Sequence, residues 1–182
     1  MANRIGAVVM MKNESDIVES FGRHILQIAD FLIIADHMST DRTREIVQKM
    51  IDEGLPIHLK LIDQIDVFHE HVFNSLINQA FELGADIVLP VDADEFFVKL
   101  DGDAKDVRRI FQNLDPHESY SIPWCNFKFV EPDSDRDKFL FARQLSFEKV
   151  NDLYKVIVGR DSYIQNDFFV LRGNHHIAKK DQ

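Results

Sequence analysis

Three carboxylates stand within four residues at the point where an apolar run of the chain ends. Residues 87–91 pass directly into Asp92, Asp94 and Glu95. Carboxylates at the end of a buried strand are costly unless a cation, a hydroxyl group or a base pairs with them. Carboxylate oxygens suit a hard divalent cation that also holds substrate phosphates. The cluster therefore predicts a divalent metal site and a phosphate-bearing substrate.

The elements that would position these carboxylates follow from the apolar pattern of the first half. Between four predicted strands, apolar residues recur at helical spacing, which predicts three helices. The four strands are predicted at Ile5–Met11, Phe31–Ala35, Ile57–Ile62 and Ile87–Val91. Strands that alternate with helices through short links indicate a mostly parallel central sheet with helices on both faces. The predicted fold class is α/β, as a three-layer sandwich.

Polar residues follow several of the predicted strands. Asn13 comes after the first strand, Asp36 after the second, and Asp92 and Asp94 after the fourth. In parallel sheets of this kind, ligands bind at the carboxyl ends of the strands. We therefore expect these side chains to converge on one crevice.

The second half of the chain has a different pattern. A helix is predicted at Asp103–Asn113, followed by segments rich in Phe, Tyr and Val that indicate strands. These segments are Ser119–Val130, Phe139–Phe147, Leu153–Val158 and Tyr163–Leu171. We interpret residues 1–182 as one domain, whose β-rich part, 99–182, builds one wall of the crevice. The chain ends soon after His175 and His176 without a closing helix, which favours a compact or truncated domain.

Composition excludes several classes of function. The formal net charge of −10 argues against non-specific nucleic-acid binding, which needs a basic surface. The single cysteine, Cys125, excludes an internal disulfide and fits a reducing cytosol. No apolar run reaches the roughly 20 residues that span a bilayer. We expect a cytoplasmic protein without a membrane span.

Three motifs, in this order, resemble those of a known family. They are KNE at residues 12–14, DHMSTDRT at 36–43 and DADEF at 92–96. Together they resemble a subgroup of the family 2-type glycosyltransferases, which have the Rossmann-like GT-A fold, over about residues 5–98. The second motif departs from the family pattern, because His37, Met38 and Arg42 replace residues that are usually Asn or Asp, Gly and Gly.

The resemblance implies a reaction and a set of site residues. The reaction is metal-dependent transfer of a sugar, of the hexosyltransferase type, from a nucleoside-diphosphate donor to an acceptor hydroxyl. Residues 1–98 would bind the nucleotide sugar through Asn13, Asp36 and Asp92, with Asp36 on the base. Asp92 and Asp94 would hold Mn²⁺ or Mg²⁺, and His175, or its neighbour His176, would complete the metal site. A glycan, a lipid-linked molecule or a protein would be the acceptor, and the enzyme would act peripherally at the inner face of a membrane.

Several roles remain open at this level. We assign catalytic roles to Asp94, through the metal, and to Glu95. Glu95 is a candidate base, a residue that orients a metal ligand, or a partner of Lys155, and Glu131 and Asp133 are further candidate bases. Trp124 is either a core residue or a platform for a sugar ring.

Three alternative functions are compatible with parts of the pattern. A phosphatase with a D-x-D motif would have Thr or Val where Glu95-Phe96 stands. A nucleotidyltransferase would have a Gly-rich loop in place of Lys12-Asn13-Glu14. A non-catalytic nucleotide-binding domain, as a fragment of a larger enzyme, is the third.

Overall fold

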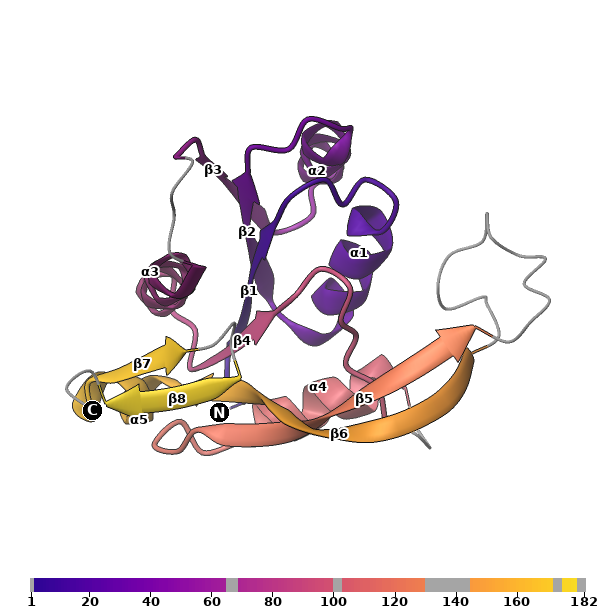
Figure 1. Ribbon diagram of the computed structural model, residues 1–182. Coiled ribbons are helices and arrows are strands. Elements are labelled where there is room, and N and C mark those ends of the chain that lie inside the picture. Colours follow the sequence, from indigo (N-terminus) through magenta and orange to yellow (C-terminus); the bar gives the residue numbers. More distant parts are fainter. Residues whose placement is uncertain (1, 65–68, 100–102, 130–144, 172–174, 180–182) are drawn as a thin grey trace.

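A computed structural model describes residues 2–64, 69–99, 103–129, 145–171 and 175–179 of the chain. It shows a mixed α/β architecture with a central six-stranded sheet and helices on both of its faces (Figure 1). A separate two-stranded sheet lies beside one of these helices. Among the described residues, no helix combines the length and apolar character needed to cross a lipid bilayer.

The four strands of the first half are parallel and occur close to the predicted positions. They pair in the order β3-β2-β1-β4, with β6 and β5 added beyond β4. Their bounds are β1 Ile5–Met11, β2 Phe31–His37, β3 Ile57–Ile62 and β4 Ile87–Val91. The helices between them are α1 Val18–Ile28, α2 Thr43–Asp52 and α3 His69–Glu82. The predicted α/β fold class is confirmed.

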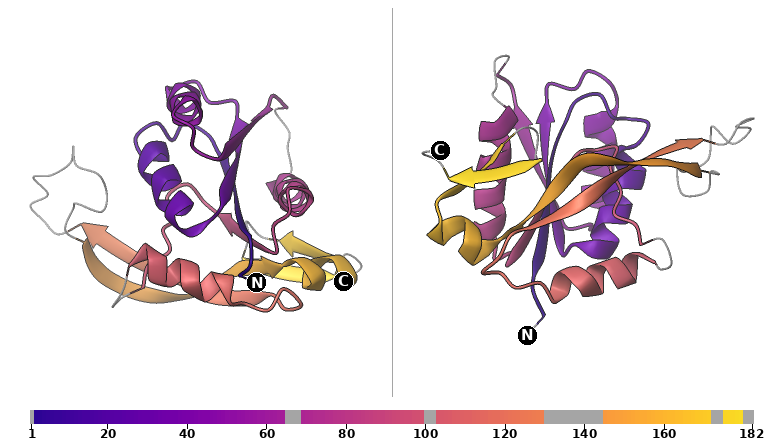
Figure 2. Two further views of the ribbon diagram at one scale, coloured as in Figure 1. Left: turned by 180° about the vertical axis from the view of Figure 1, so that it is seen from behind. Right: turned by 60° about the horizontal axis from the view of Figure 1, so that its bottom comes forward.

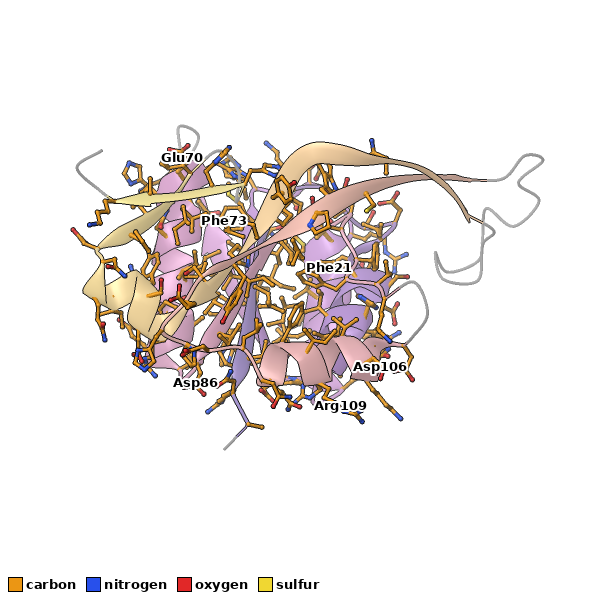
Figure 3. All side chains as sticks on the ribbon, turned by 90° about the horizontal axis from the view of Figure 1, so that it is seen from below. Phe21, Glu70, Phe73, Asp86, Asp106 and Arg109 are labelled. Carbon is orange, nitrogen blue, oxygen red and sulfur yellow. The ribbon has the colours of Figure 1, made fainter. Side chains whose placement is uncertain are left out.

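Side-chain alternation along the central strands divides the core into two layers. In β1, Ala7 and Val9 pack with α1 and α2, whereas Val8 and Met10 pack with α3. This is the two-residue period of a strand that is buried on both faces. Figure 3 shows Phe21 of α1 and Phe73 of α3 on opposite sides of the sheet. Helices therefore pack on both faces of the sheet, and the ends of its strands are left to form a site.

The second half extends the sheet with antiparallel strands. β6, Leu145–Gly159, pairs with β4 through Ile87 and Val88, and it pairs along most of its length with β5, Tyr120–Phe129. The β5–β6 ribbon reaches beyond the body of the sheet (Figures 1 and 2). Helix α4, Ala104–Gln112, packs on the α1 side through Val107 and Phe111. Because β6 runs antiparallel to β4, it carries Lys155 toward the carboxyl end of β4.

Two predictions for this half are wrong. Residues 145–147 and 153–158 belong to one continuous strand, β6, and not to two separate strands. Tyr163 lies in a short helix, α5 Arg160–Gln165, and only Phe168–Leu171 forms the strand β7, which pairs with β8, His176–Lys179. A six-residue helix is too short to show a helical period, and its Tyr and Ile also suit a strand. The candidate bases Glu131 and Asp133 lie outside the described residues.

Candidate active site

A cleft of about 290 Å³ lies at the carboxyl ends of the parallel strands. Its walls come from the ends of β1, β2 and β4 and from the first residue of α3. The lining residues are Met10, Met11, Lys12, Glu14, His37, His69, Asp92, Ala93 and Asp94. Two of the three motif carboxylates, Asp92 and Asp94, therefore meet residues of the first motif and His37 of the second in one cavity.

Asn13 joins the first two strand ends. Its Oδ1 accepts hydrogen bonds from the backbone N of Thr40 at 2.8 Å and of Asp41 at 3.4 Å. Its own backbone N donates to Oγ of Ser39 at 2.9 Å. Asn13 also has φ of 59°, in the left-handed region that Asn tolerates better than most residues. Through these hydrogen bonds, Asn13 joins the loop after β1 to the loop after β2.

Asp36 is a buried carboxylate at the end of β2. Its side chain is 1% exposed, and its Oδ2 accepts bonds from Nε of Arg44 and from the backbone N of Ser39. Its Oδ1 is buried and has no hydrogen-bond partner among the described residues. A buried carboxylate oxygen without a donor is costly. The turn that follows has a left-handed residue at Met38, with φ of 56°.

Asp92, the first carboxylate of the third motif, contacts Glu95 and Lys155. Nζ of Lys155 lies 2.6 Å from Oδ2 of Asp92 and 3.0 Å from Oε1 of Glu95. The backbone N of Asp92 donates to Oε2 of Glu95 at 3.2 Å. Burial, followed by the nearby charge of Asp92, raises the pKa of Glu95, and Lys155 opposes that rise. Both oxygens of Glu95 are therefore engaged in holding Asp92 and Lys155.

Glu14 and Asp94 interact across the cleft from different strand ends. Burial, and then the negative charge of Asp94, raise the pKa of Glu14, with smaller contributions from Asp16 and Asp41. Asp94 itself is exposed. Like charges in one cleft repel each other, and a cation placed between them relieves that repulsion. The cleft therefore has an excess of negative charge.

His175 lies beside the ribbon residue Trp124. Nδ1 of His175 is 2.8 Å from the backbone O of Tyr154, and its ring centroid is 5.4 Å from that of Trp124. Within the described ranges, no three His, Cys, Asp or Glu side chains lie close enough together to hold a metal ion as they stand. Asp92 and Asp94 line the cleft, whereas the described contacts of His175 are with Tyr154 and Trp124.

Two residues of this site make contacts that the sequence did not predict. Glu14 belongs to the first motif, but only the pairing of β1 with β4 shows that it faces Asp94. The predicted pairing of Lys155 with Glu95 is present at 3.0 Å, but the shorter contact of Lys155, at 2.6 Å to Asp92, was not predicted. The charges of Glu14 and Lys155 were the available signal in the sequence. Charged residues beside an apolar run are placed near an end of the strand that the run forms.

The comparisons with known proteins concern the fold. No protein-family model and no curated protein matches the chain. Among solved structures, GalNAc-T7 with UDP, GalNAc and Mn²⁺ matches 96% of this chain and 39% of its own, at a TM-score of 0.53 and 8% identity. The chain has the GT-A glycosyltransferase fold.

Two further solved structures are similar at lower scores. A mannosyltransferase from Pyrobaculum calidifontis, in complex with GDP-Man and Mn²⁺, is 22% identical at a TM-score of 0.46, over 60% of this chain and 33% of that one. A 4-diphosphocytidyl-2C-methyl-D-erythritol synthase is 10% identical at a TM-score of 0.45, over 88% and 77% of the two chains. The chain thus spans 33% of the mannosyltransferase and 39% of GalNAc-T7.

Proposed function

We propose that this chain binds a nucleoside-diphosphate sugar and a divalent cation, and acts as a metal-dependent glycosyltransferase that moves the sugar to an acceptor hydroxyl. The proposal rests on one observation: Glu14, Asp92 and Asp94 line the same cleft at the strand ends. The GT-A fold and the order of the three motifs support it. The fold alone would not, because one fold hosts many activities.

The cleft fits a hard divalent cation. Its acidic donors are carboxylate oxygens, which Mg²⁺ and Mn²⁺ accept together with substrate phosphates and water. Burial first, and then the negative charge of Asp94, raise the pKa of Glu14, and a cation would neutralise the second of these effects. In this proposal Asp94 and Asp92 hold the cation. His175 remains a candidate third ligand from the far end of the chain, and its Nδ1 is already occupied by Tyr154.

The nucleotide would lie along the ends of β1 and β2. Oδ1 of Asp36 is a buried acceptor without a donor, and a ring N–H of a base is a donor that would satisfy it. Asn13 would act indirectly, since its side chain holds Thr40 and the loop that follows Asp36. The predicted contact of Asn13 with the nucleotide sugar thus becomes a positioning role in this proposal.

A bound cation would supply positive charge to the diphosphate leaving group as its bond to the sugar breaks. The residues of the chain would orient that group through Asp92, which Lys155 and Glu95 hold in place. Because both oxygens of Glu95 are engaged, we assign it to orienting Asp92 and not to proton abstraction. The acceptor, as a glycan, a lipid-linked molecule or a protein, would enter from the side of β5 and β6.

A nucleotide-binding domain without turnover is the second candidate. The engagement of Glu95 favours it, because the acid nearest the metal motif is then not available as a base. The D-x-D phosphatase is disfavoured, because Glu95-Phe96 stands where its motif would have Thr or Val and the carboxylates follow the fourth strand and not the first.

Hydrolysis of nucleotide sugars with Mn²⁺ tests the proposal. UDP-, GDP-, CDP- and dTDP-sugars would be incubated with the protein, with Asp94→Asn and with Asp52→Asn, whose exposed side chain on α2 serves as the control. We expect one donor class to be hydrolysed by the protein and by the control, and not by Asp94→Asn. Metal-dependent binding of a donor without hydrolysis would support the second candidate. Absence of both binding and hydrolysis would contradict both candidates.

A further inference from the structure

Lys155 is a buried lysine that contacts Asp92, a residue of the cleft that we expect to bind a cation. Its side chain is 6% exposed. Burying an ammonium group is expensive unless anions surround it. Asp92 at 2.6 Å and Glu95 at 3.0 Å are those anions, and the Nζ atom also lies 5.8 Å from the centroid of the Trp124 ring.

The backbone fixes this position. β6 pairs antiparallel with β4 at Ile87–Gly159 and Val88–Val158, so that residues before Val158 run toward the end of β4. β5 pairs Ile122 with Lys155, and its register shifts between Pro123 and Cys125, the step that contains Trp124. Pairing of β6 with β4 and β5 therefore fixes the backbone position from which the Lys155 side chain reaches Asp92.

The charges of Asp92, Glu95 and Lys155 affect how tightly a metal ion binds. Asp92 and Glu95 carry two negative charges, and Lys155 offsets one of them. A divalent cation that approaches Asp92 meets a unit positive charge already in contact with the same carboxylate. At such distances the repulsion between cations is strong in a partly buried site. A diphosphate brings further negative charge and offsets the repulsion.

We infer that Lys155 is a positioning residue: its ammonium group holds Asp92 in the metal-free protein and weakens binding of a divalent cation alone, so that tight metal binding requires a nucleoside diphosphate. The inference rests on the proposed function, because it assumes that Asp92 is a metal ligand. By thermodynamic linkage, the metal strengthens diphosphate binding by the same factor as the diphosphate strengthens metal binding.

Mn²⁺ binding to the protein alone tests this role, with free Mn²⁺ followed by electron paramagnetic resonance. Lys155→Met keeps an apolar side chain of similar length without the charge, and Lys155→Arg keeps the charge. We expect Lys155→Met to bind Mn²⁺ about tenfold more tightly than the natural protein, since a nearby unit charge is removed. Lys155→Arg should stay within about twofold of the natural protein, because the charge that sets the Mn²⁺ affinity is retained. Equal or weaker binding by folded Lys155→Met would overturn the inference.

A second pair of variants covers the case in which Lys155→Met unfolds because Glu95 loses its partner. Glu95→Gln and the double variant Glu95→Gln/Lys155→Met differ only in the ammonium group beside Asp92. The double variant should bind Mn²⁺ about tenfold more tightly than Glu95→Gln, for the same electrostatic reason. Equal binding by the two would overturn the inference.

The same titrations with UDP, GDP, CDP or dTDP separate this inference from the proposed function. We expect the nucleotide to strengthen Mn²⁺ binding more in the natural protein than in Lys155→Met. If one of these nucleotides promotes Mn²⁺ binding in the natural protein, but loss of Lys155 does not strengthen binding of Mn²⁺ alone, the proposed function stands and the role of Lys155 is refuted. If no variant binds Mn²⁺, alone or with UDP, GDP, CDP or dTDP, the proposed metal site is refuted together with this inference.

Discussion

The guanidinium group of Arg44 donates from Nε to the buried carboxylate of Asp36, and this bond joins helix α2 to the end of strand β2. Asp36 is 1% exposed and Arg44 is 36% exposed. Arg44 thus supplies the positive charge that allows Asp36 to stay buried where we propose that a nucleotide base binds.

Arg44→Met should lower the free energy of unfolding by about 2 kcal/mol, because it leaves a buried carboxylate without its cation, and partial exposure of Arg44 moderates the cost. Arg42→Met is the matched control. Arg42 pairs with Glu45 on the surface, at side-chain exposures of 73% and 66%, and its loss should cost less than about 0.5 kcal/mol. Urea unfolding of both variants measures the difference, and equal losses would contradict the role of Arg44.

Substitutions of Asn13 separate its hydrogen bonds from its backbone conformation. Asn13→Gly should cost about 1 kcal/mol, because it loses the bonds to Thr40 and Asp41 and keeps φ of 59° without strain. Asn13→Ala should cost about 1 kcal/mol more, since a side chain with Cβ is disfavoured in the left-handed region. Chemical denaturation orders the two variants. Greater stability of Asn13→Ala than of Asn13→Gly would refute the assignment of strain.

Gly159 should not tolerate a side chain. A Cβ atom there would lie 2.1 Å from the backbone O of Glu118 and 2.6 Å from that of Pro116. Gly159→Ala should therefore lower stability by about 3 kcal/mol, because backbone atoms have to move. At Gly54 a Cβ would meet nothing within 4 Å, and only φ of +89° opposes it. Gly54→Ala should cost about 1 kcal/mol. Thermal unfolding of the two variants compares the sites, and a milder effect at Gly159 would be inconsistent with this packing.

His24 should make stability depend on pH. Burial lowers its pKa below the ordinary value, and its ring packs 5.3 Å from that of Phe96 in the third motif. The unfolded chain therefore binds a proton near pH 6.5 that the folded chain takes up only at lower pH. As pH falls below about 6.5, the folded state loses stability through this group, by no more than about 1.4 kcal/mol per pH unit.

His24→Leu removes the side chain that binds this proton. Free energies of unfolding at pH 5, 6, 7 and 8 should show the natural protein losing stability relative to His24→Leu between pH 7 and 5, with no relative change between pH 7 and 8. A constant difference between the two proteins across the whole range would rule out the assignment.

The first half of the fold was predictable because its strands are buried on both faces. Continuous apolar runs such as Ile5–Met11 predict such strands directly. The second half was less predictable, since Lys155 and its neighbours form one long strand whose pairing with β4 is antiparallel and distant in sequence. Sequence alone located Asp92 and Asp94 at a strand end, but long-range pairing was needed to place Lys155 and Glu14 beside them. The contact of His175 with Tyr154 depends on the same ribbon.

We propose that Asp92 and Asp94, the carboxylates after β4, would hold a divalent cation together with a nucleoside diphosphate. A thermal-shift measurement with UDP, GDP, CDP and dTDP, each with and without Mn²⁺, tests it most directly, because a ligand that binds the folded state raises the unfolding temperature. We expect at least one of the four nucleotides to stabilise the protein only when Mn²⁺ is present, and Asp94→Asn to lose that stabilisation. Failure of all four to stabilise the protein, or an equal shift in Asp94→Asn, would contradict the claim.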